Sequence, residues 1–129
     1  MRSRSGFAAI LILIAVPLMS AARAGQPEEI IIDTDIGTDI DDAFAVALAL
    51  RSSELNILGI TTASGDTEAR ARILDRMLGE VGHPEIPVAA GAPTTLPYGA
   101  TVDQHRYGET GHSARTTHPD AVAFLSDQI

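Results

Sequence analysis

The sequence predicts an α/β fold built on a parallel sheet with flanking helices. Two observations favour this class: short apolar runs alternate with longer runs of helical periodicity, and acidic or glycine-containing turns separate them. Strands that alternate with helices in this way are typical of βαβ units, whose strands lie parallel in one sheet. The chain has 129 residues, which is the length of one small domain.

Residues 1–24 are typical of a secretory signal peptide. A short basic start is followed by an uncharged run of 17 residues, 6–22, and then by the small-x-small signal Ala22-Arg23-Ala24. An uncleaved anchor is the alternative, but the run is at the lower limit for a membrane span and Pro17 interrupts it. We therefore expect cleavage after Ala24 and a secreted or periplasmic protein that has no membrane contact once the signal is removed.

The first half of the remaining chain predicts a strand, a helix and a second strand. Residues 30–32 are three isoleucines, which predict a strand buried on both faces of a parallel sheet. Residues 43–50 form an apolar helical run, and Asp41 or Asp42 can cap its N-terminus. Residues 55–62 predict the second strand.

The second half predicts a helix, a short strand, a loop and a last helix. Residues 67–80 have apolar positions at helical spacing, and Gly82 is placed to end that helix. Residues 86–90 predict the third strand, and residues 119–128 predict the last helix. Between them, residues 91–117 are rich in Gly, Pro, Thr and His, which predicts a long loop that is functional or disordered.

Composition excludes several classes of function. From Gly25 on, the chain carries 6 basic and 17 acidic residues, a net charge of −11. A nucleic-acid-binding surface needs clustered basic side chains, so we expect no nucleic-acid partner. The chain has no cysteine, which excludes disulfides, thiolate metal sites and a cysteine nucleophile.

An acidic turn directly follows the first predicted strand. Residues 33–42 contain five aspartates: Asp33, Asp35, Asp39, Asp41 and Asp42. Carboxylates this close repel one another and raise one another's pKa, and capping a helix needs only one or two of them. A hard divalent cation such as Ca²⁺ or Mg²⁺ would neutralise them, because both ions prefer oxygen ligands. The turn therefore predicts a metal site.

Two kinds of metal site compete on the residues of this turn. The EF-hand pattern fails, because its Gly and Glu positions fall on Thr38 and Phe44 when counted from Asp33. A magnesium phosphatase of the haloacid-dehalogenase type fits Asp33-Thr-Asp35, with Asp33 as the nucleophile, although Ile36 intrudes before Gly37 and Thr38.

The chain resembles the N-terminal portion of the inosine/uridine-preferring nucleoside hydrolase family. That family opens with an apolar strand, an Asp-x-Asp-x-Gly turn, an Asp-Asp pair and an Ala-rich helix, here residues 30–50. The resemblance continues through residues 59–66 and 87–93 and reaches residues 107–111. It implies a Rossmann-like parallel sheet with flanking helices and a truncated nucleoside hydrolase domain over residues 25–129.

The resemblance also implies an activity and a site. The reaction would be calcium-dependent hydrolysis of the N-glycosidic bond of purine or pyrimidine ribonucleosides, giving ribose and the free base. By similarity, Asp35 and Asp42 would bind Ca²⁺, and Asp35 would also accept a proton from the attacking water. Asp41 would hold a ribose hydroxyl, and Asp66 stands where the family has a sugar-binding Asn. Asp33 and Asp39 are further candidates for metal ligands.

Some residues depart from the family's pattern. Asp66 can equally cap the helix that follows it. Tyr107 replaces the family's His, while His105 and His112 beside it are interpreted as ordinary loop residues, and His118 as a helix-start residue.

Family enzymes are also substantially longer, so we expect this chain to be a fragment or a truncated product that binds calcium weakly and catalyses poorly alone. An inactive module that binds nucleoside or calcium is the non-enzymatic alternative, and homo-oligomeric assembly is a further expectation.

Overall fold

The computed structural model describes residues 25–95, 102–109, 115 and 117–128. The predicted signal peptide, its cleavage site and His112 lie outside the described residues.

A parallel sheet of three strands forms the centre of the described part of the chain. The strands are β1 (Glu28–Thr34), β2 (Leu55–Thr62) and β3 (Val88–Ala90), in the order β1-β2-β3. Thr34 lies beside Thr62, and Thr62 lies beside Ala90, so all three strands end at the same edge of the sheet. The α/β class with a parallel sheet and flanking helices is confirmed.

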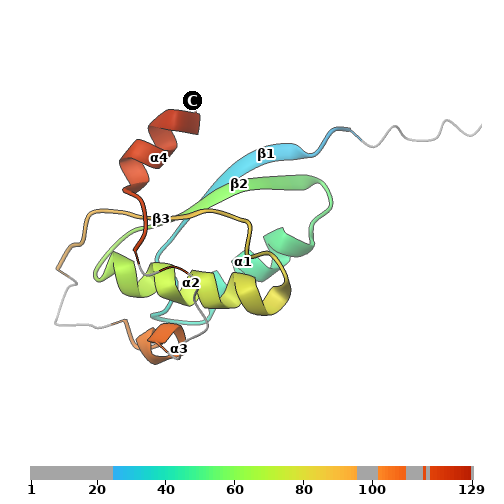
Figure 1. Cartoon of the computed structure of the whole chain (residues 1–129). Coiled ribbons are helices and arrows are strands. Elements are labelled where there is room, and N and C mark those ends of the chain that lie inside the picture. Colours follow the sequence, from blue (N-terminus) through green and yellow to red (C-terminus); the bar gives the residue numbers. More distant parts are fainter. Residues whose placement is uncertain (1–24, 96–101, 110–114, 116, 129) are drawn as a thin grey trace, which may run out of the picture.

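Helices cover both faces of the sheet. Helices α1 (Asp41–Arg51) and α2 (Thr67–Val81) lie on one side, and α4 (Ala121–Gln128) lies on the other (Figure 1). The short helix α3 (His105–Glu109) packs under α2, away from the sheet. The prediction of an unbroken loop over residues 91–117 is therefore wrong at α3.

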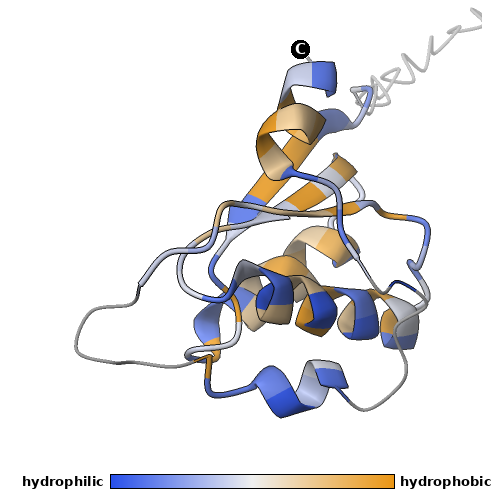
Figure 2. Cartoon of the chain, turned by 60° about the vertical axis from the view of Figure 1, so that its left-hand side comes forward, coloured by the Kyte–Doolittle hydropathy of each residue, from blue (hydrophilic) through white to orange (hydrophobic). Residues whose placement is uncertain are grey.

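The core lies between the sheet and helices α1 and α2. Apolar side chains from β2, β3 and α2 dominate it, and Figure 2 shows the orange, hydrophobic side of α2 turned toward the strands. The prediction that residues 30–32 are buried on both faces is wrong, because all three isoleucines are only half-buried. In the described part of the chain β1 is an edge strand with β2 as its neighbour, which leaves one side of it uncovered.

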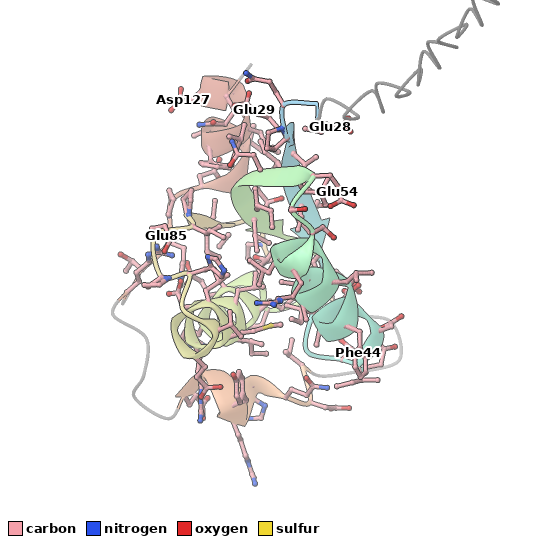
Figure 3. All side chains as sticks on the ribbon, turned by 90° about the vertical axis from the view of Figure 1, so that its right-hand side faces the viewer. Glu28, Glu29, Phe44, Glu54, Glu85 and Asp127 are labelled. Carbon is pink, nitrogen blue, oxygen red and sulfur yellow. The ribbon has the colours of Figure 1, made fainter. Side chains whose placement is uncertain are left out.

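Helix α1 also keeps an uncovered apolar stripe. Ile40, Phe44 and Leu48 follow one another at intervals of four and are 60%, 70% and 71% exposed. Phe44 points away from the rest of the molecule in Figure 3. Among the described residues, no helix has the length and apolar character needed to cross a membrane.

Helix ends follow the predicted signals in part. Gly82 ends α2 with a left-handed φ of 89°, as expected. The expected cap at the start of α1 is wrong: Ile40 occupies the N-cap position, and Asp41 and Asp42 lie inside the first turn. Negative charge is favourable there because the helix dipole is positive at that end. Both carboxylates remain available for other contacts.

Gly91 follows β3 at a point where its backbone lies very close to the backbone of β2. A Cβ at this position would lie 2.4 Å from the carbonyl oxygen of Thr62. We expect Gly91→Ala to lower the free energy of unfolding by about 1–3 kcal/mol in urea titrations, as overpacking does. In the control Gly79→Ala the new Cβ meets nothing within 4 Å, and the helix should gain about 0.5–1 kcal/mol. Equal stabilities of the two variants would contradict the close packing at Gly91.

Candidate functional site

Three loops meet at the edge of the sheet where the strands end. The acidic turn, residues 33–42, includes the last two residues of β1 and runs into the first turn of α1. Residues 63–66 follow β2, and Gly91 follows β3. Backbone bonds join them: the N–H of Ala63 donates to Thr34, and the N–H of Gly91 donates to Thr62. In parallel α/β sheets this edge is where ligands bind. It therefore carries the candidate site.

The backbone of the acidic turn is held by side chains at its base. The hydroxyl of Thr34 accepts from the N–H of Ile36 at 3.1 Å and donates to the carboxylate of Asp42 at 2.9 Å. Gly37 has a φ of 105°, a conformation that side chains rarely adopt, and its carbonyl accepts from the N–H of Gln104 at 3.0 Å. These contacts fold the turn back toward the start of α1.

Asp35 and Asp42 converge in this turn. Oδ2 of Asp42 accepts from the backbone N–H of Asp35 at 3.1 Å, and the two side chains hydrogen bond to each other. The pKa of Asp35 is raised, first by that hydrogen bond and then by burial and by the negative charge of Asp42. The charge of Arg70 opposes this rise. The structure thus brings together the two residues expected to share a metal ion.

Asp39 and Asp41 form a second, fully exposed acidic pair. The pKa of Asp39 is raised, chiefly because it hydrogen bonds to Asp41 and lies near that residue's negative charge. The pKa of Asp41 is lowered, because it accepts from Asp39 and from the backbone N–H of Asp42. Asp41 is therefore the member of this pair that holds a negative charge most readily.

Asp33 is separated from these pairs. Its Oδ1 accepts from the hydroxyl of Thr61 at 2.6 Å. It also lines a cavity of about 390 Å³ together with Ile31 and with Ala121 and Leu125, on the α4 side of the sheet. Neighbouring side chains of a strand point to opposite faces, which is why Asp33 and Thr34 diverge. The phosphatase hypothesis needs Asp33 beside a metal-binding carboxylate, and this placement does not favour it.

Asp66 caps α2. Its Oδ1 accepts from the N–H of Ala69 at 2.9 Å, which confirms the capping interpretation of this residue. The side chain is exposed at the edge of the sheet where the acidic turn also lies.

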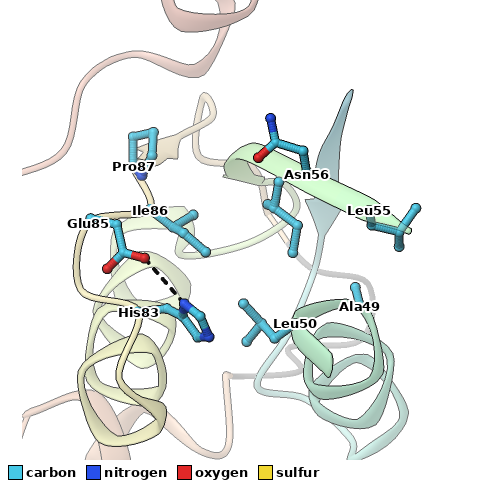
Figure 4. A pocket seen from close by; sticks show the side chains of 9 residues that line it. Ala49, Leu50, Leu55, Asn56, His83, Glu85, Ile86 and Pro87 are labelled. Atoms are coloured by element: carbon cyan, nitrogen blue, oxygen red, sulfur yellow. Dashed lines mark hydrogen bonds and ion pairs between the residues drawn. The ribbon is translucent and has the colours of Figure 1, made fainter. Parts of the chain in front are cut away.

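A second cavity lies at the opposite end of the sheet. It has a volume of about 340 Å³ and is open between the end of α1 and the connection from α2 to β3 (Figure 4). His83 and Glu85 lie together on one side of it, 3.2 Å apart, and Leu50 and Leu55 lie on the other side. This cavity lies at the end of the sheet where the strands start, so it is not part of the candidate site at the acidic turn.

The described residues do not form a complete metal site by themselves. Among them, no group of three or more His, Cys, Asp or Glu side chains is arranged to hold a metal ion. Asp35 and Asp42 together offer at most four carboxylate oxygens, whereas Ca²⁺ takes six to eight. The chemistry of this donor set suits a hard cation, but the set is incomplete.

Tyr107 lies away from the acidic turn. Its ring packs 4.2 Å from the guanidinium carbon of Arg76, and its hydroxyl donates to Glu80 at 2.6 Å. Burial and Glu80 raise the pKa of Tyr107 to about 12. Tyr107 therefore anchors α3 to α2.

His118 belongs to a buried cluster of charged side chains. The interpretation of His118 as a helix-start residue missed this cluster. The His118 side chain is fully buried, with Nδ1 2.8 Å from Glu68 and Nε2 2.8 Å from Asp75. Arg115 adds a bond to Asp75 at 2.7 Å. The partners are 43 and 50 residues apart from His118, so no local pattern reveals the cluster. Asp75 on the buried face of α2 was the available signal.

Comparison with known proteins identifies the family. The family model for inosine-uridine preferring nucleoside hydrolases matches residues 30–129. Uridine nucleosidase 1 of Arabidopsis thaliana is 32% identical over 81% of this chain and 34% of its own length. The inosine-uridine preferring nucleoside hydrolase of Leishmania major is 40% identical over 67% of this chain and 27% of its own length. The pyrimidine-specific ribonucleoside hydrolase RihA of Salmonella paratyphi B is 42% identical over 64% of this chain and 26% of its own length. The chain spans about a third or less of the curated relatives it matches. It belongs to the inosine-uridine preferring nucleoside hydrolase family.

Proposed function

We propose that the protein hydrolyses the N-glycosidic bond of ribonucleosides and releases ribose and a free base. The observation that carries this proposal is the convergence of Asp35 and Asp42 at the carboxyl edge of the sheet. The names of the relatives support the substrate class, because they specify uridine, inosine and uridine, or pyrimidine ribonucleosides.

We further propose that the reaction depends on calcium, with Asp35 and Asp42 among its ligands. The raised pKa of Asp35 supports this proposal, because it reflects two carboxylates held close together, and a divalent cation would relieve their repulsion. When bound, calcium would supply a water molecule of lowered pKa. The remaining ligands would come from outside the described residues.

Each aspartate then has a separate task. Asp35 accepts a proton from the attacking water, and Asp42 fixes the backbone of the turn through the N–H of Asp35. Asp41 keeps its negative charge because of its lowered pKa and accepts a hydrogen bond from a ribose hydroxyl. Asp66 is a further candidate for a sugar contact, alongside its role as a cap.

The charge of the site suits the reaction. Cleavage of the N-glycosidic bond passes through a transition state that resembles a positively charged oxocarbenium ion. Several aspartates around it stabilise that charge more than they stabilise the neutral substrate. The same charges repel the phosphate of a nucleotide, so we propose that uncharged nucleosides are the substrates.

We also propose that the predicted signal peptide directs the protein to the periplasm or the medium.

An assay of the intact protein purified from its source tests this function. We expect release of base from inosine or uridine in the presence of Ca²⁺, abolition by EGTA and recovery when Ca²⁺ is restored. p-Nitrophenyl phosphate should not be cleaved. Nucleoside binding without turnover would instead establish the inactive binding module, and phosphate release would establish the phosphatase. The mass of the same preparation tests cleavage after Ala24.

A further inference from the structure

Arg70 is a buried cation that the proposed chemistry does not use. It lies in the first half of α2, and it is fully buried, with 0% of its surface exposed. Burial of a charge is costly unless hydrogen bonds compensate it. Its position therefore calls for a structural or functional reason.

The guanidinium group of Arg70 joins the two loops of the candidate site. Nε donates to the carbonyl of Ser64 at 2.7 Å, in the loop after β2. Nη1 donates to the carbonyls of Asp35 and Ile36, the latter at 2.7 Å, and Nη2 donates to the hydroxyl of Thr38 at 3.1 Å. Three of these four acceptors belong to the acidic turn, and one of those is the backbone of Asp35 itself.

The acceptors and their arrangement require arginine in particular. All four are neutral oxygens, so these bonds fix geometry and do not neutralise a carboxylate. A guanidinium group presents its donors in a rigid planar fork, whereas a lysine ammonium is a single point of charge on a flexible chain. Lysine at this position would keep the positive charge, but its single ammonium group could not donate to both loops at the same time.

We propose that Arg70 is a positioning residue that fixes the backbone of the acidic turn against the loop after β2, so that Asp35 is held in place to meet Asp42. This inference rests on the proposed function for its catalytic meaning. The hydrogen bonds of Arg70 are independent of the proposed function, because they are present in the folded chain without any ligand.

Two effects of Arg70 on cation binding oppose each other. Its positive charge lies near Asp35 and would repel a divalent cation. Its bonds to the turn would favour the cation by holding the ligands in place, as groups that orient metal ligands generally do. If positioning is the stronger effect, removal of the fork weakens binding even when the charge is kept.

The test compares calcium affinity by calorimetry in the intact protein and in four variants. We expect Arg70→Lys and Arg70→Met both to weaken Ca²⁺ binding roughly 10–100-fold, as loss of a group that orients metal ligands does. Thr38→Val removes one acceptor from an exposed loop position and should weaken binding in the same direction but less. Arg72→Met, two positions away on the same helix, is the matched control and should bind as the unaltered protein does.

A second readout needs no cation. Hydrogen exchange at the amides of residues 35–38 should be faster in Arg70→Lys and Thr38→Val than in Arg72→Met, with the rest of the sheet unchanged. Wild-type exchange in a folded Arg70→Lys variant would overturn the proposal, and so would tighter Ca²⁺ binding by Arg70→Lys. Should the unaltered protein bind no Ca²⁺, the proposed function fails, and the exchange data still decide the role of Arg70. Should the Arg70 variants not fold, Thr38→Val decides it.

Discussion

Replacement of Asp75 by alanine is expected to lower the free energy of unfolding by about 3–5 kcal/mol, because it removes one partner from a buried ionic cluster. The Asp75 side chain is only 4% exposed and accepts from both Arg115 and His118. Without it, the fully buried imidazole of His118 keeps Glu68 but loses its other carboxylate. Urea unfolding followed by circular dichroism measures the loss.

The control for this prediction is the exposed pair of His83 and Glu85. Their side chains are 41% and 68% exposed, so Glu85→Ala should leave the stability almost unchanged. A loss in Asp75→Ala no larger than that of Glu85→Ala would show that the buried cluster contributes nothing.

The pH dependence of the loss gives an independent check. Both ring nitrogens of His118 face carboxylates, which suits the doubly protonated cation, and the pKa of His118 is raised above its ordinary 6.5 by Asp75 first and then by Glu68. A histidine with a raised pKa in the folded state stabilises fully below pH 6.5 and loses that contribution as pH rises through the raised pKa. The difference between the unaltered protein and Asp75→Ala should therefore shrink in alkaline solution.

Local patterns in the sequence predicted the elements but not their surroundings. The second strand, residues 55–62, has the predicted bounds, because its apolar run and its flanking turns are local features. The burial of residues 30–32 was wrong, because burial depends on which strands lie beside β1. The helix α3 was missed, because five residues carry little periodicity and α3 is held by contacts with Arg76 and Glu80 of α2.

In the candidate site, too, local features could be predicted and contacts between distant residues could not. The resemblance to the family paired Asp35 with Asp42, whereas the turn itself offers five aspartates and singles out no two of them. The contacts of Arg70 could not be predicted, because its acceptors are 6 to 35 residues away and are mostly backbone oxygens that any sequence offers. One signal did exist: Arg70 lies on the stripe of α2 that also carries Ala71, Leu74 and Leu78, where apolar residues are the rule. A charged residue in such a stripe indicates a buried partner.

The largest effect on activity is expected from an isosteric change of Asp35, compared with the same change of Asp33. Asp35→Asn removes the proposed general base together with a proposed metal ligand, and should reduce nucleoside hydrolysis by roughly 10²–10⁴-fold. Asp33→Asn keeps an oxygen that can accept from the hydroxyl of Thr61, so hydrolysis should change little.

Both changes replace one carboxylate by an amide within the same turn, so they alter the net charge equally and differ only in place. Asp35 lies with Asp42, whereas Asp33 faces the cavity beside α4. Initial rates with inosine and uridine, measured together with calorimetric Ca²⁺ affinity, separate the two variants. If Asp33→Asn abolished turnover while Asp35→Asn left it intact, the chemistry would belong to Asp33, and the assignment of the site to Asp35 and Asp42 would be wrong.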